Sequence, residues 1–141
     1  MAERYGRKGG SQFTDFTDMD LQPEGAQTGL AADSTGIKYT SQRYRLLDAE
    51  LVSGIQTAYI EASKTSSAGD ETVTVELYDE TVGSVVGSIT ITGASNYTRG
   101  PINIGTARQG NQVSVRWNVT SASATSGATF DATSASLVIK S

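Results

Sequence analysis

The sequence contains no cysteine and no histidine among its 141 residues. The absence of cysteine excludes disulfide bridges and thiolate nucleophiles, and the absence of both residue types excludes zinc sites with the usual ligands. Acid–base catalysis by histidine is excluded as well. Aspartate and glutamate are therefore the residues left for enzymatic chemistry.

Long hydrophobic runs are also missing. No apolar stretch approaches the roughly 20 residues that a membrane-spanning helix needs, and the N-terminus lacks the hydrophobic segment of a secretory signal. The formal net charge is -4, and the lysines and arginines are scattered along the chain rather than gathered in a stripe. We therefore expect neither a nucleic-acid partner nor a membrane partner.

The first part of the chain shows no sustained hydrophobic period, and glycine or proline recurs through it. Its apolar residues are isolated from one another. The stretch FTDFTDMDL, residues 13–21, is compatible with one helical turn or with an extended anchor. We interpret residues 1–43 as an extended N-terminal arm and residues 44–141 as a β-sandwich domain.

After Tyr44 apolar and polar residues alternate with period two, which is typical of strands with one buried face. In TVTVELY, residues 72–78, the two valines and the leucine face inward. In QVSVRWNVT, residues 112–120, the valines and Trp117 do so, and we interpret the tryptophan as a core residue. Seven or eight such short strands predict an all-β antiparallel sandwich of the jelly-roll type, with an immunoglobulin-like sandwich as the alternative.

Carboxylates are the residues from which glycosidase pairs and calcium sites are built. Glu61 and Glu76 fall at outward positions of predicted strands, and we interpret them as ordinary surface residues. The unit Asp-Glu-Thr-Val occurs at 70–73 and at 79–82. We favour the interpretation that these two units form polar turns. A calcium site made of their acids is the alternative. The sequence thus predicts no catalytic residue, no metal and no cofactor.

Ordering an arm of about forty residues is costly, because each backbone residue costs roughly 1–2 kcal/mol. The few apolar side chains of the arm contribute about 1.5–3 kcal/mol each when buried, which offsets only part of this cost. Main-chain pairing with the sheet edge of another subunit would supply the remainder. We therefore expect the arm to bind neighbouring subunits.

A β-sandwich that follows a long polar arm and carries no catalytic motif resembles the decoration or cement proteins of tailed viruses. The resemblance implies a minor capsid protein made in the host cytoplasm and placed on the virion exterior. Its partners would be the major capsid protein and neighbouring copies of itself, with a trimer favoured. The residues assigned to partner binding are Arg4, Arg7 and Lys8 for acidic capsid surface, Phe13, Phe16, Met19 and Leu21 for apolar capsid pockets, and Tyr5 of the same arm.

Two other roles stay open. A carbohydrate-binding module or a head fibre for glycan attachment would use exposed aromatic side chains, with Tyr59, Tyr78 and Tyr97 as the platform. A tail or baseplate component would share the arm and the sandwich but assemble with a different symmetry. For the capsid role we expect that removal of residues 1–40 leaves the sandwich folded and soluble, with a near-unchanged melting temperature, but abolishes or strongly weakens its binding to the assembly.

Overall fold

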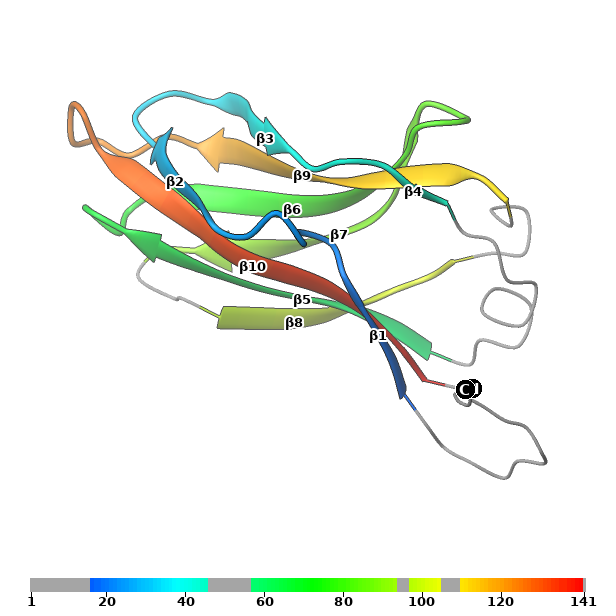
Figure 1. Ribbon diagram of the computed structural model, residues 1–141. Helices are drawn as coiled ribbons and strands as arrows, with labels where there is room; N and C mark the ends of the chain where they lie inside the picture. Colours follow the sequence, from blue (N-terminus) through cyan, green and yellow to red (C-terminus); the bar gives the residue numbers. More distant parts are fainter. Residues whose placement is uncertain (1–15, 46–56, 94–96, 105–109, 141) are drawn as a thin grey trace.

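The computed structural model describes residues 16–45, 57–93, 97–104 and 110–140, and within these ranges all regular structure is β-strand (Figure 1). No helix long and apolar enough to cross a membrane occurs in them. The strands are β1 (Phe16–Asp20), β2 (Gln27–Ala31), β3 (Gly36–Thr40), β4 (Tyr44–Arg45), β5 (Thr57–Ser66), β6 (Thr72–Asp79), β7 (Ser84–Thr92), β8 (Tyr97–Ile102), β9 (Gln112–Ser121) and β10 (Thr129–Lys140).

The strands form two antiparallel sheets that pack face to face (Figure 1). The first sheet has the order β1-β10-β5-β8, with β2 also paired to β10, and the second has the order β3-β9-β6-β7, with β4 also paired to β9. Since β1 and β2 follow one another along one side of β10, they act as one interrupted edge strand, and β3 and β4 do the same along β9. Counted in this way, the eight strands have the order of a jelly roll. The predicted β-sandwich is confirmed.

The segment that the sequence assigned to an arm is largely part of this sandwich. Within residues 16–43, β1 and β2 pair with β10, and β3 pairs with β9. Leu21, directly after β1, is fully buried in the core. The arm interpretation is therefore wrong for residues 16–43. The sequence did not reveal these strands because each is five residues long and turns with positive-φ glycines, such as Gly25, separate them, so no long hydrophobic period is visible. Residues 1–15 lie outside the described residues.

The core contains the inward residues that the alternation predicts. The inward residues of β6 and β9 are fully or almost fully buried: Val73, Val75, Leu77, Val113, Val115, Trp117 and Val119. The Trp117 ring lies 6.2 Å from the ring of Phe130 on the opposite sheet. Its indole N–H donates to Oε1 of buried Gln22, whose Nε2 donates to the carbonyl of Ala132 at 3.2 Å. The one polar atom of the tryptophan is thus satisfied inside the core.

Two glycines let the sheets approach each other where β7 faces β8. A Cβ added at Gly87 of β7 would lie 2.7 Å from Cβ of Ile102, and a Cβ added at Gly100 of β8 would lie 2.5 Å from Cγ2 of Ile89. Each glycine therefore receives an isoleucine of the other strand. This reciprocal contact closes one side of the sandwich, since such distances leave no room for a side chain.

Candidate functional site

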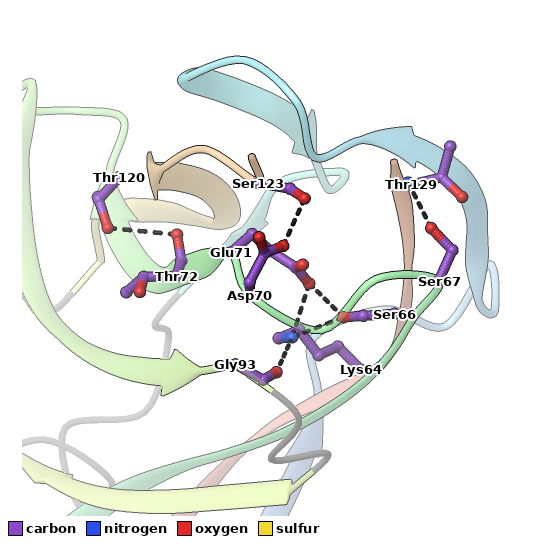
Figure 2. Close-up of polar contacts among 10 residues, drawn as sticks. All are labelled: Lys64, Ser66, Ser67, Asp70, Glu71, Thr72, Gly93, Thr120, Ser123 and Thr129. Atoms are coloured by element: carbon purple, nitrogen blue, oxygen red, sulfur yellow. Dashed lines mark hydrogen bonds and ion pairs between the residues drawn. The ribbon is translucent and has the colours of Figure 1, made fainter. Parts of the chain in front are cut away.

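A cluster of polar side chains fastens one end of the sandwich, and Figure 2 shows how its members point toward one another. At its centre is Lys64 of β5, whose ammonium donates to Oγ of Ser66 at 2.7 Å, to Oε2 of Glu71 at 2.8 Å and to the carbonyl of Gly93 at 2.7 Å. The Lys64 side chain is 1% exposed and that of Glu71 is 0% exposed. The ion pair joins the first sheet to the start of β6 in the second.

The charges of this pair depend on each other. Burial by itself raises the pKa of Glu71, but hydrogen bonds from Lys64 and Ser66 and the positive charge of Lys64 outweigh it and hold the pKa below its usual value. In the part of the chain that the structure describes, Oε1 of Glu71 is buried without a hydrogen-bond partner. Because three acceptors occupy the Lys64 ammonium, the amine is engaged in structure rather than available as a base or nucleophile.

Asp70 extends the cluster to the connection between β9 and β10. It accepts a hydrogen bond from the hydroxyl of Ser123 (Figure 2). It also accepts one from the backbone N–H of Ala124 at 3.0 Å. These two bonds lower the pKa of Asp70 from its ordinary value. Nearby, Ser67 and Thr129 exchange hydrogen bonds. Three segments distant in sequence are therefore tied together at this end.

The acids considered for calcium binding are not brought together. Asp70 and Glu71 precede β6, whereas Asp79 ends it and Glu80 follows it. A strand of this length separates the two pairs by roughly 25 Å. Within the described ranges no group of three or more acidic side chains is arranged to hold a metal ion. Asp70 and Glu71 instead accept hydrogen bonds from Ser123 and Lys64, whereas Asp79 and Glu80 accept them from Asn111 and Ser114.

The two glutamates at outward strand positions also lie apart, because Glu61 is on β5 of the first sheet and Glu76 on β6 of the second. Glu61 pairs with Arg99 at 3.3 Å, and Glu76 accepts a hydrogen bond from Asn118 at 3.3 Å. Both are partly exposed. Glu61 and Glu76 therefore do not form a pair of neighbouring carboxylates.

The three tyrosines proposed as a glycan platform do not share one surface. Tyr59 of β5 and Tyr97 of β8 lie on the outer face of the first sheet, whereas Tyr78 of β6 lies on the outer face of the second. The guanidinium of Arg99 is 4.2 Å from the Tyr59 ring centroid, and that of Arg116 is 3.4 Å from the Tyr78 ring centroid. A platform on this protein would therefore contain two of the three tyrosines.

The residues assigned to partner binding divide into three groups. Met19 packs against the hydrophobic core and Leu21 belongs to it, so neither is available to fill a pocket on another protein. Phe16 is the first residue of β1. The remaining partner-binding residues lie outside the described residues: Arg4, Tyr5, Arg7, Lys8 and Phe13.

No protein-family model and no curated protein matches the chain. Among solved structures, it is similar to the insecticidal delta-endotoxin Cry8Ea1 of Bacillus thuringiensis, with 11% identity and a TM-score of 0.49 over 92% of this chain and 25% of the toxin. The infectious bursal disease virus Gx strain structure gives 15% identity and a TM-score of 0.43 over 93% of this chain and 32% of that one. A Bacillus endospore appendage has 11% sequence identity and a TM-score of 0.32 over 95% of this chain and 98% of that one.

The chain thus spans about a quarter and about a third of the first two of these proteins. The fold itself follows from the strand order of the two sheets.

Proposed function

We propose that the chain is a structural protein of a virus particle, a decoration or cement protein on the capsid exterior that contacts the major capsid protein and copies of itself. The jelly roll is an architecture that viral capsid domains use, as lectin domains also do. The proposal includes a homo-oligomer, with a trimer favoured, and no enzymatic, nucleic-acid-binding or membrane-binding role.

The observation that carries the proposal is the place where the chain enters the fold. β1 begins at Phe16 on the edge of the first sheet and pairs with β10. We propose that residues 1–15, which precede this edge strand in the sequence, contact neighbouring subunits; fully extended, fifteen residues span at most about 50 Å. In this proposal the arm is shorter than the sequence suggested.

The distribution of charged residues along the chain supports the same proposal. The whole chain has 11 basic and 15 acidic side chains, of which three basic and two acidic lie in residues 1–15, so residues 16–141 carry a net charge of -5. The three basic residues, Arg4, Arg7 and Lys8, fall within five positions. A short basic segment on an acidic body favours attachment to acidic surface, which neighbouring copies of this body provide.

Immuno-electron microscopy tests the proposal. Virus particles are purified on a density gradient from the source of the sequence and labelled with an antibody raised against the full chain. We expect label over the head exterior. Label confined to the tail would favour the tail or baseplate alternative, and particles without label would overturn the virion role.

An add-back experiment then tests the basic segment. Particles stripped of the chain are incubated with wild type or with the variant Arg4→Gln/Arg7→Gln/Lys8→Gln, and bound protein is quantified. We expect the variant to rebind far more weakly with an unchanged melting temperature. A control with the same net charge carries three exposed substitutions in the body: Thr28→Glu, Thr92→Glu and Thr125→Glu. Equal rebinding by both variants would contradict the role of the segment.

Glycan binding is the second candidate, because Tyr59 and Tyr97 share the outer face of the first sheet and Arg99 stands beside Tyr59. Aromatic faces and an adjacent cation are suited to sugar rings and their acidic groups. A glycan array with wild type, Tyr59→Ala and the control Tyr78→Ala tests it. Absence of wild-type binding, or equal loss in both variants, would exclude this platform.

A further inference from the structure

Arg116 of β9 is the one arginine of the described ranges whose guanidinium has neither a hydrogen bond nor an ion pair, and its Nε–H is buried without an acceptor. A buried donor without an acceptor costs free energy and is rare in folded proteins. The other three arginines of these ranges are engaged by their own chain: Arg43 contacts Glu80 at 3.5 Å, Arg45 donates to the Gly110 carbonyl at 3.4 Å, and Arg99 contacts Glu61 at 3.3 Å. Arg116 thus lacks the acceptor that each of the others has.

The ring of Tyr78 holds this guanidinium in place. Cζ of Arg116 lies 3.4 Å from the ring centroid of Tyr78, which belongs to the neighbouring strand β6. Among the nitrogens of Arg116 only Nε is buried without a partner, so the two terminal Nη groups remain accessible. A guanidinium presents its donors in a planar fork that matches a carboxylate. Because stacking already fixes the plane of the fork, an anion that binds it causes little further loss of side-chain entropy.

A similar arrangement on the other sheet indicates what Arg116 lacks. On the outer face of the first sheet Arg99 stacks on Tyr59 at 4.2 Å, and its Nε lies 3.3 Å from Oε2 of Glu61 on the paired strand. On the outer face of the second sheet Glu76 lies opposite Arg116, but the two side chains form no ion pair in the described chain. The first arrangement contains its own carboxylate and the second does not. A carboxylate from outside the chain would therefore complete the Arg116 arrangement.

Arg116 is surrounded by side chains of three adjacent strands on the outer face of the second sheet. Two of these, Asn118 and Glu76, are joined by a hydrogen bond of 3.3 Å from Nδ2 to Oε2. Ile37, which is 49% exposed, adds an apolar side chain opposite Asn118. Since neighbouring strands lie about 4.8 Å apart, the group extends over about 10 Å. We call it the Arg116 site, and its members are Ile37 and Thr40 of β3, Arg116 and Asn118 of β9, and Thr74 and Glu76 of β6.

The hydrogen-bonding capacities of these side chains restrict the ligand. Arg116 only donates, the carboxylate of Glu76 only accepts, and the amide of Asn118 does both. A ligand that satisfies the site must therefore bring an anionic acceptor to Arg116 and a neutral donor to Glu76. An acidic side chain of another protein brings the acceptor but no donor, and its charge repels Glu76. A sugar acid has a carboxylate and several hydroxyls on one ring, which meets both requirements.

We propose that the Arg116 site binds the sugar acid of an acidic glycan. The carboxylate of the sugar accepts hydrogen bonds from the two Nη groups of Arg116, one sugar hydroxyl donates to Glu76, and an apolar edge of the sugar lies beside Ile37. This inference goes beyond the proposed function, because it assigns a ligand to the outer face of the second sheet. It also differs from the platform around Tyr59, which is on the outer face of the first sheet.

Ligand titrations of the full chain, followed by chemical shifts in NMR spectra, test the proposal without any substitution. The probes are the methyl glycosides of glucuronic acid and of N-acetylneuraminic acid. We expect at least one of them to bind with a dissociation constant of roughly 1 mM. Its carboxyl methyl ester should bind at least about tenfold more weakly, because the ester has lost the charge that Arg116 recognises. Acetate, which has the carboxylate without the hydroxyls, should also bind at least about tenfold more weakly.

Two substitutions assign the carboxylate contact to Arg116. Arg116→Gln should bind the acid and its ester equally weakly, and Arg116→Lys should bind the acid at least about threefold more weakly than wild type, because an ammonium lacks the planar fork. The control Arg99→Gln removes the corresponding arginine of the first sheet and should bind as wild type does. A general folding defect in Arg116→Gln would leave the preference for the acid over its ester intact. On a glycan array, Tyr78→Ala should lose acidic glycans and Tyr59→Ala should keep them, because Tyr78 holds Arg116.

Three results would overturn the inference: no binding of either probe, equal binding of acid and ester by wild type, or a preference for the acid that survives in Arg116→Gln. Acetate that binds as tightly as the sugar acids would also overturn it, because an acidic side chain of a protein would then be the better ligand. Particle labelling is independent of these outcomes, so the proposed function can stand if the Arg116 site fails.

Discussion

Replacement of Lys64 by methionine should destabilise the protein severely. The side chain lies in the sandwich with 1% exposure, and its ammonium is the charge partner of Glu71 at 2.8 Å. Lys64→Met removes this partner and leaves a buried carboxylate whose Oε1 already has no hydrogen bond in the described chain. Breaking a buried ion pair in this way costs about 3–5 kcal/mol. For a chain of this size the melting temperature should fall by roughly 10–20 °C.

Urea and thermal unfolding, followed by circular dichroism, measure the effect. The double variant Lys64→Met/Glu71→Leu removes both charges and should recover to within about 2 kcal/mol of wild type, because apolar side chains of similar volume replace the pair. The difference between the sum of the single variants and the double variant gives the coupling. The control Arg99→Met removes a partly exposed partner of Glu61 and should cost less than about 1 kcal/mol.

Two results would refute this reasoning. A loss of less than about 1 kcal/mol in Lys64→Met would mean that the carboxylate is not held as a buried charge. A double variant as unstable as the sum of its single variants would mean that the two side chains act independently.

Three further predictions follow from the described contacts. Because folding lowers the pKa of Glu71 below its ordinary value of 4.5, its contribution to stability is present above that pH and is lost as the pH falls through the lower folded value. Urea unfolding from about pH 6 to pH 3 should therefore show a flatter pH dependence for Glu71→Gln than for wild type. Gly87→Ala should cost about 1–3 kcal/mol in the same assay through overpacking, whereas the neighbouring exposed change Ser88→Ala should be close to neutral. Contrary to the expectation from the sequence, deletion of residues 1–40 removes three strands and should abolish cooperative unfolding, whereas deletion of residues 1–15 should preserve it. A folded 41–141 fragment would contradict the sheet pairing.

The central strands were predictable from the sequence because they are long and one of their faces is buried throughout. β6 and β9 extend over eight and ten residues, so the alternation is repeated often enough to be recognised. The edge strands β1, β2 and β3 have five residues each, and the two apolar side chains in each of them do not form a visible period. Length explains why one part of the fold was predicted and the other was assigned to an arm.

The buried ion pair had a signal that was not used. Lys64 has the same parity in β5 as the inward residues Ala58 and Ile60, and Glu71 has the same parity as Val73. The alternation therefore places both charges inward. The alternation does not predict that the two side chains contact each other, because that contact depends on how the end of β5 packs against the start of β6.

The sequence by itself determined the all-β class, the inward residues of the central strands and the exclusion of cysteine and histidine chemistry, because these follow from composition and local alternation. Only the tertiary structure decided that residues 16–43 belong to the sandwich, that Tyr59 and Tyr78 occupy different outer faces, and that Val82 is exposed where Val73 is buried. The reason is physical. Alternation along a strand fixes which side chains share a face, whereas the sheet that a strand joins and the loops that meet at its end are set by contacts between residues distant in sequence.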